Sequence, residues 1–249
     1  TNVQMIGNQF LVRGYDNGQH VMFREEYSPT LFVPSKKKTN HKTLEGDFVE
    51  PVKPGLVRDC KEFINKYQDV DGFSIYGNER FTYQYISDKY PETEIKFDTS
   101  KIKLVTLDIE VAAENGFPDT ESCSEEILTI TIQDYNTKKI ITWGVKPFNN
   151  TQSNVTYHEC TSEHHLLSSF MSFWTNDYPE VITGWNIQFY DIPYICGRLG
   201  KVLGEKQRRM FSPWGMVTYR EMFVHGRKQI FYEVNGISQL DYLDLYKKF

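Results

Sequence analysis

An apolar segment near the middle of the chain ends in two acidic residues. Residues 102–107 have the length and the β-branched content of a buried strand, and Asp108 and Glu110 follow them directly. Side chains at i and i+2 share one face of a strand, so both carboxylates are predicted to point away from the core while Ile109 points into it. Neighbouring carboxylates repel each other and gain nothing from burial unless a cation lies between them. The segment therefore predicts either a divalent metal site, because hard cations prefer carboxylate oxygens, or the solvated face of an antiparallel strand.

A second segment further along the chain ends in another acidic residue. A short apolar strand at 181–183 leads into a turn that carries Asn186, and a helix follows with Asp191 in or near its first turn. In open α/β sheets, the ends of strands and the starts of helices form the ligand crevice. Asp191 is therefore expected to meet the two strand carboxylates at one edge of the sheet. The alternative is that Asp191 is only the N-cap of its helix.

Together these segments resemble family-B DNA polymerases. Leu-Asp-Ile-Glu at 107–110, followed by Gly-Trp-Asn-x-x-x-Tyr-Asp-Ile-Pro-Tyr at 184–194, is similar to the first two exonuclease motifs of that family. The likeness is greatest to the replicative polymerases of T-even-type tailed bacteriophages, and it extends in order over essentially the whole chain. Further similar segments lie at 26–32, 85–88, 94–98 and 240–249.

The resemblance implies the N-terminal and proofreading part of a replicative DNA-directed DNA polymerase. Two divalent ions, Mg²⁺ or Mn²⁺, would support 3′→5′ hydrolysis of mispaired primer ends. Asp108 is implied to bridge the two ions and Glu110 to hold the ion beside the attacking water. Asp191 is implied to serve the ion beside the leaving group. The expected DNA partner is a primer–template with a single-stranded 3′ end.

Five further residues are candidates for nucleic-acid binding. The amide of Asn186 could hydrogen-bond the backbone of the substrate strand. Phe117 and Tyr190 could stack on unpaired bases, an interaction worth roughly 1–3 kcal/mol per base, although Tyr190 could equally belong to the core. Gly226 and Lys228 lie at the turn of a predicted hairpin, for which Gly226 would supply the positive φ. The resemblance implies that this hairpin helps to part the primer from the template, and the alternative is a plain surface hairpin.

The order of predicted elements indicates a mixed α/β fold with two domains. Residues 1–100 are expected to form a smaller, β-rich α+β N-terminal domain. Residues 101–249 are expected to contain three antiparallel strands and then a helix, a strand and a helix, which the resemblance identifies as a ribonuclease-H-like 3′→5′ exonuclease domain with a mixed sheet. Strands are expected at 9–14, 19–23, 30–33, 102–111, 127–134, 139–145, 181–183, 216–221 and 229–234, and helices at 56–66, 163–174 and 192–203.

The family pattern is matched only in part. Its third exonuclease motif, Tyr-x-x-x-Asp, supplies a fourth carboxylate, but the pattern from Tyr67 to Asp71 precedes Asp108 and falls in the other predicted domain. Asp241 is assigned no metal role. The chain is therefore expected to hold an incomplete exonuclease domain, as a fragment or as one half of a split polymerase. It is expected to bind divalent ions weakly and to cleave poorly without the remaining polymerase domains, whether these are covalently attached or a separate chain.

Composition sets broader limits. The net charge of −5 and the isoelectric point near 5.7 argue weakly against nucleic-acid binding, yet basic clusters at 36–38 and 226–228 could act locally. No apolar run approaches the roughly 18 residues of a membrane span, and no signal peptide is evident, so no membrane contact is expected. Four scattered cysteines argue against zinc and for a reducing cytoplasm. The resemblance implies that this is the cytoplasm of an infected bacterial host.

Two other functions remain open. A free-standing exonuclease of the same fold would be fully active without a partner. A non-catalytic binding module would contact RNA or a template strand through its first hundred residues. The resemblance implies that this region binds messenger RNA, but no motif in this sequence carries that role over. Retained single-strand affinity in an Asp108→Ala, Glu110→Ala double variant, with no cleavage by the parent, would favour the module.

Overall fold

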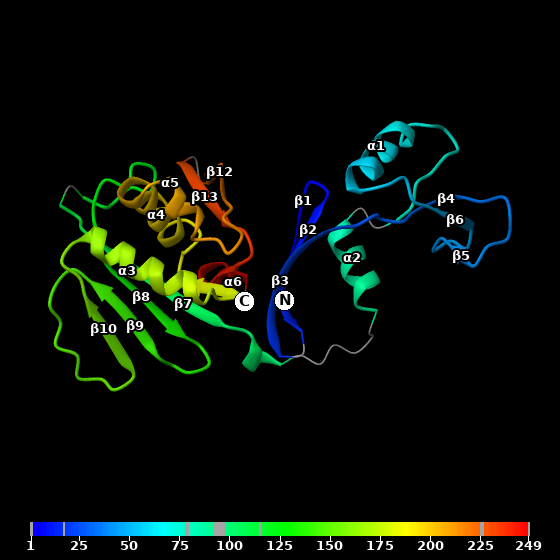
Figure 1. The fold of residues 1–249 in the computed structure, drawn as a ribbon. Helices are drawn as coiled ribbons and strands as arrows, with labels where there is room; N and C mark the ends of the chain where they lie inside the picture. The colour runs from blue at the N-terminus through cyan, green and yellow to red at the C-terminus, as the bar shows by residue number, and fades with distance from the viewer. Residues whose placement is uncertain are drawn as a thin grey trace. The chain divides into compact units, whose positions relative to one another are not determined.

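The chain folds into two compact units in the computed structural model, residues Thr1–Phe97 (unit 1) and Asp98–Phe249 (unit 2) (Figure 1). Secondary structure is both helical and extended in each unit, which confirms the predicted mixed α/β class. The structure describes residues 2–16, 18–77, 80–91, 98–114, 116–224 and 227–248.

Unit 1 contains, within its described residues, two antiparallel sheets of three strands and two helices. The sheets have the strand orders β1-β2-β3 and β4-β6-β5. The rings of Phe10 and Tyr85 stack in its core with their centroids 4.7 Å apart, which ties β2 to α2. The predicted strands and helix of this half correspond to β2, β3, β4 and α1. The elements are β1 Asn2–Ile6, β2 Gln9–Asp16, β3 Gln19–Glu26, β4 Leu31–Pro34, β5 His41–Lys42, β6 Phe48–Val52, α1 Val57–Tyr67 and α2 Phe81–Lys89.

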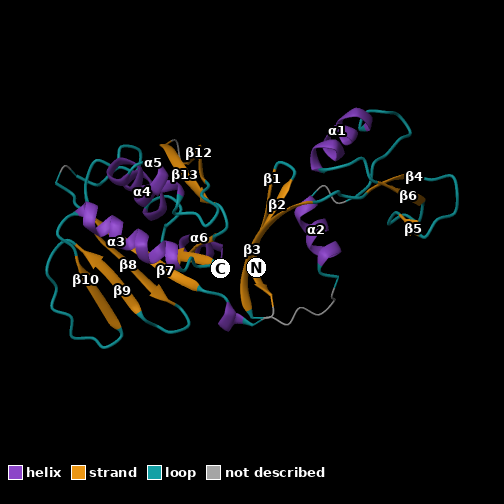
Figure 2. Ribbon diagram, in the orientation of Figure 1, coloured by secondary structure: helices purple, strands orange, loops and turns teal. Residues whose placement is uncertain are grey.

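The described residues of unit 2 form a mixed sheet of six strands in the order β10-β9-β8-β7-β11-β14 (Figure 2). The three central strands β7, β8 and β9 are antiparallel neighbours, as predicted. The outer strands are parallel to their partners: β10 to β9, β11 to β7 and β14 to β11. The strands are β7 Leu104–Val111, β8 Ile127–Asp134, β9 Ile140–Gly144, β10 Val155–Glu159, β11 Val181–Gly184 and β14 Ser238–Asp241.

Two features of unit 2 differ from the prediction. The strands β10 and β14 extend the sheet at both edges, whereas the sequence pattern indicated neither. The predicted helix at 192–203 is an α-helix only as far as Arg198 and continues as a π-helical segment, so its i→i+4 ladder is interrupted. The remaining elements are η1 Thr99–Lys101, α3 Glu163–Asn176, α4 Asp191–Arg198, η2 Leu199–Leu203, α5 Glu205–Arg209, β12 Val217–Val224, β13 Arg227–Val234 and α6 Tyr242–Lys248.

A buried ion pair joins the two main helices of unit 2. Glu163 begins α3 and Arg198 ends α4, and the Arg198 Nε–H donates to Glu163 Oε1 over 2.7 Å. The same oxygen accepts from the backbone N–H of Ile127 at the start of β8, over 2.9 Å. Hydrogen bonding to Glu163 is the main cause that raises the pKa of Arg198. This network fixes where α4 lies relative to the sheet.

Candidate active site and nucleic-acid interface

Strand β7 presents Asp108 and Glu110 on one exposed face, in the alternation that the sequence predicts. Leu107 and Ile109, on the opposite face, are buried in the core of unit 2. Neither carboxylate makes a hydrogen bond or an ion pair with another described residue. The loss of part of its surrounding water raises the pKa of Asp108. The strand therefore carries two acidic groups that no described residue neutralises.

A close backbone approach brings β11 against this part of β7. The strands run parallel, with Thr183 opposite Thr106, and β11 stops at Gly184. A Cβ atom at Gly184 would lie 2.6 Å from the carbonyl oxygen of Leu107, closer than real Cβ contacts allow. Glycine is therefore required here, because it lets the chain turn immediately beside the residue that precedes Asp108.

The turn that follows Gly184 is folded around a buried carboxylate, Asp241. This residue ends β14 and is only 4% exposed. Its Oδ1 accepts from the backbone N–H of Asn186 and of Leu243, each over 2.9 Å, and its Oδ2 accepts from the N–H of Gln188 over 3.0 Å. Asn186 lies in the left-handed region with φ +60°, which asparagine tolerates better than most residues. The sequence had suggested no role for Asp241, and the structure gives it a structural one.

Asp191, at the start of α4, faces β7. The N-cap position belongs to Tyr190 and has no side-chain capping bond, so the alternative that Asp191 is merely a helix cap is wrong. Instead, Asp191 Oδ1 accepts from the backbone N–H of Ile109 over 3.1 Å. Asp191 is 3% exposed. This burial, and then the negative charge of Asp108, raise the pKa of Asp191 to about 7.

Asp191 contacts β7 between Asp108 and Glu110, but the three carboxylates do not form a finished metal site. Across the parts of the chain that the structure describes, no three His, Cys, Asp or Glu side chains converge as a metal-binding group. The donor set is nevertheless suited to a hard divalent cation, because all its ligands are carboxylate oxygens. A cation would also relieve the repulsion from Asp108 that helps to raise the pKa of Asp191. By its chemistry, the set fits a divalent ion.

The two aromatic candidates lie side by side. The ring centroids of Phe117 and Tyr190 are 5.4 Å apart, with the planes tilted by 42°. Phe117 is 86% exposed, whereas Tyr190 is half-buried and also packs against the core of unit 2. Burial, and then the charges of Asp191 and Glu110, raise the pKa of Tyr190. An exposed aromatic surface therefore lies next to the carboxylates.

Helix α4 holds the loop that carries Phe117. This loop spans residues 112–126, apart from residue 115, which lies outside the described residues. The Tyr194 hydroxyl donates to the carbonyl of Glu125 over 2.9 Å, and Arg198 Nη1 donates to the carbonyl of Cys123 over 3.0 Å. Sequence reasoning missed both contacts, because nothing in the local pattern of α4 signals partners so far away along the chain.

The predicted hairpin is formed by β12 and β13 and is longer than expected. Gly226, proposed for its turn, lies outside the described residues. Lys228 is described, and its Nζ lies 2.9 Å from Glu221 Oε1 and 3.0 Å from Glu121 Oε1. Hydrogen bonds to Glu221 and then to Glu121 raise the pKa of Lys228. Its charge is therefore compensated inside unit 2, where it links the hairpin to the loop that carries Phe117.

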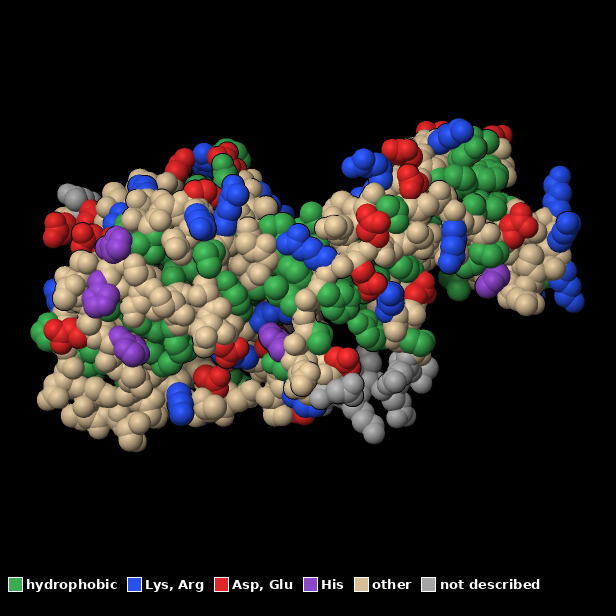
Figure 3. Space-filling model, in the orientation of Figure 1, with side chains coloured by type: hydrophobic (Ala, Val, Ile, Leu, Met, Phe, Trp, Pro, Cys, Tyr) green, Lys and Arg blue, Asp and Glu red, His purple; other side chains and the backbone are tan. Residues whose placement is uncertain are grey.

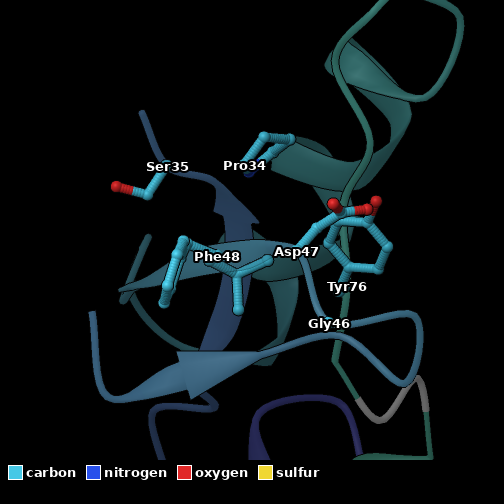
Figure 4. A pocket seen from close by; sticks show the side chains of 7 residues that line it. Pro34, Ser35, Gly46, Asp47, Phe48 and Tyr76 are labelled. Carbon is cyan, nitrogen blue, oxygen red and sulfur yellow. The ribbon is translucent and has the colours of Figure 1, made fainter. Parts of the chain in front are cut away.

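Unit 1 has a separate basic end near β4 and β5, where lysines gather in Figure 3. Lys36, Lys37, Lys38 and Lys42 are exposed there and make no ion pair with a described residue. Beside them is a pocket of about 440 Å³ (Figure 4). Its lining residues are Pro34, Ser35, Gly46, Asp47, Phe48, Val49 and Tyr76. All of them belong to unit 1.

Comparison with known proteins agrees with the motifs. Residues 70–249 match the family described as DNA polymerase family B, exonuclease domain, and this match begins inside unit 1. The whole chain is 30% identical over 275 aligned positions to the DNA-directed DNA polymerase of Enterobacteria phage T4, and 99% of it is 29% identical to that of Escherichia phage RB69. In each case it spans 30% of the polymerase's length. A region covering 57% of the chain is 28% identical to the DNA polymerase catalytic subunit of human herpesvirus 6A, of which it spans 15%.

Proposed function

This chain belongs to the family-B DNA polymerases through their exonuclease domain, and from this premise we propose that it removes mispaired nucleotides from the 3′ end of a primer strand. The proposal assigns residues 101–249 to the ribonuclease-H-like exonuclease domain and residues 1–100 to a separate N-terminal domain. Family membership implies a general dependence on divalent metal ions and a DNA partner. The observation that carries the proposal is the position of Asp191, whose buried carboxyl group contacts the stretch of β7 that presents Asp108 and Glu110.

The proposed chemistry assigns a different task to each carboxylate. Divalent ions, Mg²⁺ or Mn²⁺, would lower the pKa of a bound water and neutralise charge on the scissile phosphate. Asp108, whose negative charge acts on Asp191, would be shared between two ions. Glu110 would orient the attacking water, and Asp191 would face the departing 3′ oxygen. Because the pKa of Asp191 is about 7, this group must lose its proton before it can bind a cation.

The substrate strand would be held by groups beside the carboxylates. Phe117 and Tyr190 would stack on the last unpaired bases, which suits a site that must accept every mismatch because stacking does not depend on sequence. The amide of Asn186, in its fixed turn, would donate to the backbone of that strand. We assign Lys228 a supporting contact through the Phe117 loop, since two carboxylates already compensate its charge.

The phage relatives are named DNA-directed DNA polymerases, and the chain spans only 30% of their length. Polymerase activity is therefore proposed for an assembly in which this chain acts with polymerase domains in the same or a separate chain. The proposed setting is the cytoplasm of an infected bacterium, on primer–template DNA. No helix among the described residues is long and apolar enough to cross a membrane.

Digestion of 5′-labelled single-stranded DNA tests this function. We expect weak shortening from the 3′ end with Mg²⁺ or Mn²⁺ and none with EDTA or in the Asp108→Ala variant. Labelled products that shorten in single-nucleotide steps would identify the polarity. Cleavage that persists in the variant, or in EDTA, would contradict the proposal. A parent chain that neither cleaves nor binds DNA under any metal condition would also contradict the proposal.

A second proposed function concerns the basic end of unit 1. The unpaired lysines beside a pocket that contains Phe48 and Tyr76 favour a contact with single-stranded RNA or template DNA. Lys42 Nζ already lies 5.0 Å from the Phe48 ring centroid, which shows that a cation and an aromatic face meet there. Replacing Lys36, Lys37 and Lys38 by Gln should flatten the salt dependence of RNA binding, because fewer counterions are released from the RNA. An unchanged salt slope would overturn this second function.

A further inference from the structure

We propose that Asp241 is a positioning residue for the substrate strand, because its carboxylate holds the turn that aims the amide of Asn186. This inference rests on the proposed exonuclease function. It concerns a residue outside both sequence motifs, on the edge strand β14. Asp241 would not touch DNA itself but would act through the turn at 184–188.

The first support is the geometry of the carboxylate. Three backbone N–H groups, those of Asn186, Gln188 and Leu243, converge on its two oxygens at 2.9–3.0 Å. The side chain is almost fully buried, so few water molecules could replace these bonds. Oδ1 accepts from two of these donors and Oδ2 from one, so most of the acceptor capacity of the carboxylate is used to hold the turn.

The second support is the conformation that Asp241 maintains. Asn186 has φ +60°, a left-handed conformation that asparagine adopts more readily than most non-glycine residues. One of the three donors is the N–H of Asn186 itself. The carbonyl of Asn186 accepts from the N–H of Tyr190 over 3.0 Å, so the turn leads directly into α4 and toward Asp191. A change at Asp241 is therefore transmitted to the start of the helix that carries the third carboxylate.

The third support is the attachment of β14 to the rest of the site. Asp241 is the register partner of Gly184, the residue whose backbone lies close to Leu107 of β7. One residue earlier, the carbonyl of Leu240 accepts from the Thr183 hydroxyl over 2.7 Å. Strand β14, the turn and β11 thus form one hydrogen-bonded unit, in which Asp241 holds the turn and Leu240 holds β11. The side chain at position 241 can therefore determine how far Asn186 projects beyond the ends of these strands.

The test compares Asp241→Asn with Asp244→Asn. Both substitutions remove one negative charge, but Asp244 is exposed on α6 whereas Asp241 is buried. In Asp241→Asn one carboxylate oxygen is replaced by an amide nitrogen, which donates hydrogen bonds and cannot accept one from a backbone N–H. Amide hydrogen exchange would follow the protection of Asn186 and Gln188. Fluorescence anisotropy in EDTA would measure the affinity of each protein for a 5′-labelled oligothymidylate.

We expect Asp241→Asn to speed exchange at the turn amides and to weaken oligothymidylate binding about tenfold, while Asp244→Asn changes neither. The effect should vanish in a background that lacks the Asn186 side chain. Thus Asp241→Asn combined with Asn186→Gly should bind no more weakly than Asn186→Gly alone, because residues that act through one another are not additive. A purely structural role would lower the melting temperature but leave the affinity of the folded protein unchanged.

The possible results distinguish the positioning role of Asp241 from the exonuclease function on which it rests. If the parent neither binds the oligonucleotide nor cleaves it with Mg²⁺ or Mn²⁺, the exonuclease proposal falls and the role of Asp241 falls with it. If the parent binds and Asp241→Asn binds equally well, only the positioning role is overturned. Effects of Asp241→Asn and Asn186→Gly that multiply would also overturn it, since they would show that the two residues act independently.

Discussion

Asp191 accepts a hydrogen bond from the backbone N–H of Ile109, 3.1 Å away. The first residue of α4 therefore contacts β7 between its two acidic residues. Ile109 lies between Asp108 and Glu110 in the sequence. The contact therefore brings a buried carboxyl group from a distant segment to the only two positions of β7 that carry exposed carboxylates. Several consequences of this arrangement can be measured on the purified chain.

Stability should fall with rising pH because of Asp191. Its folded-state pKa is about 7, against an ordinary value of 3.8, so between these values the folded chain holds a proton that the unfolded chain has lost. The stabilisation is complete below the lower value and is lost as the pH rises through about 7. The difference corresponds to on the order of 4 kcal/mol at most.

The Asp191→Asn variant isolates this effect, since its amide oxygen can still accept from Ile109. In EDTA we expect the variant to be more stable than the parent near neutral and mildly alkaline pH, with a flatter dependence of the unfolding free energy on pH. Urea unfolding across the pH range measures both curves. Parallel curves for the two proteins would show that Asp191 titrates normally.

Gly184→Ala should displace the turn beside β7. The added methyl group would lie 2.6 Å from the Leu107 carbonyl oxygen, and overpacking of this kind costs about 1–3 kcal/mol. Gly200→Ala is the matched control, because a Cβ atom there meets only Arg208 at 3.6 Å, an ordinary contact. Thermal unfolding should separate the two variants, and equal melting temperatures would contradict the close approach.

Two substitutions of Asn186 should separate its role in the backbone conformation from its role in DNA binding. Asn186→Gly keeps access to the left-handed region and removes only the amide, so its stability should change little. Asn186→Ala must hold the same φ with an ordinary side chain, at a cost of about 1–2 kcal/mol. Both variants should bind single-stranded DNA more weakly than the parent. Full affinity in Asn186→Gly would exclude the amide as a contact to DNA.

Loss of one partner of the buried ion pair between Glu163 and Arg198 should strongly destabilise the folded chain. Glu163→Gln leaves the Arg198 guanidinium without its counter-charge, and breaking such a pair costs about 3–5 kcal/mol. The exposed pair between Lys101 and Asp98, 3.7 Å apart, provides the comparison, and Asp98→Asn should destabilise the fold much less because water screens an exposed pair. Denaturant unfolding of both variants checks the contrast, which would fail if Glu163→Gln were as mild as Asp98→Asn.

Phe117→Ala should weaken DNA binding without weakening the fold. The side chain is 86% exposed, so its removal forfeits little core packing. Loss of one stacked base would reduce affinity by roughly 5- to 150-fold, from 1–3 kcal/mol per base. Phe148→Ala, which removes another exposed ring of unit 2 at 62% exposure, should leave affinity unchanged. Anisotropy with a labelled oligonucleotide distinguishes them, and equal affinities would remove Phe117 from the binding surface.

The parts of the site that the sequence could predict are those with local causes. The alternation along β7 follows from strand geometry alone, so the exposed positions of Asp108 and Glu110 could be read directly. The position of Asp191 at the start of a helix after a short apolar strand was predictable in the same way. The approach of Asp191 to this part of β7, seen in its hydrogen bond with the Ile109 N–H, follows from the general rule for strand ends and helix starts.

The remaining features depend on partners that are distant along the chain. Strand β14 is four residues long and mostly polar, and it exists because it pairs in parallel with β11. Asp241 therefore looks like any acidic residue until the fold brings it to the N–H groups of Asn186 and Gln188. The contacts of Tyr194 and Arg198 with the Phe117 loop are hidden in the same way. Non-local hydrogen bonds leave no periodic signal in the sequence.

The central claim is that Asp108, Glu110 and Asp191 together bind divalent cations, and calorimetric titration of Mn²⁺ into the metal-free chain tests it most directly. We expect weak binding by the parent, with proton release below about pH 7 as Asp191 ionises. We also expect that binding is lost in Asp108→Asn and that proton release disappears in Asp191→Asn. Mn²⁺ binding that is the same in the parent and in both variants would contradict the account and remove the carboxylates from the proposed chemistry.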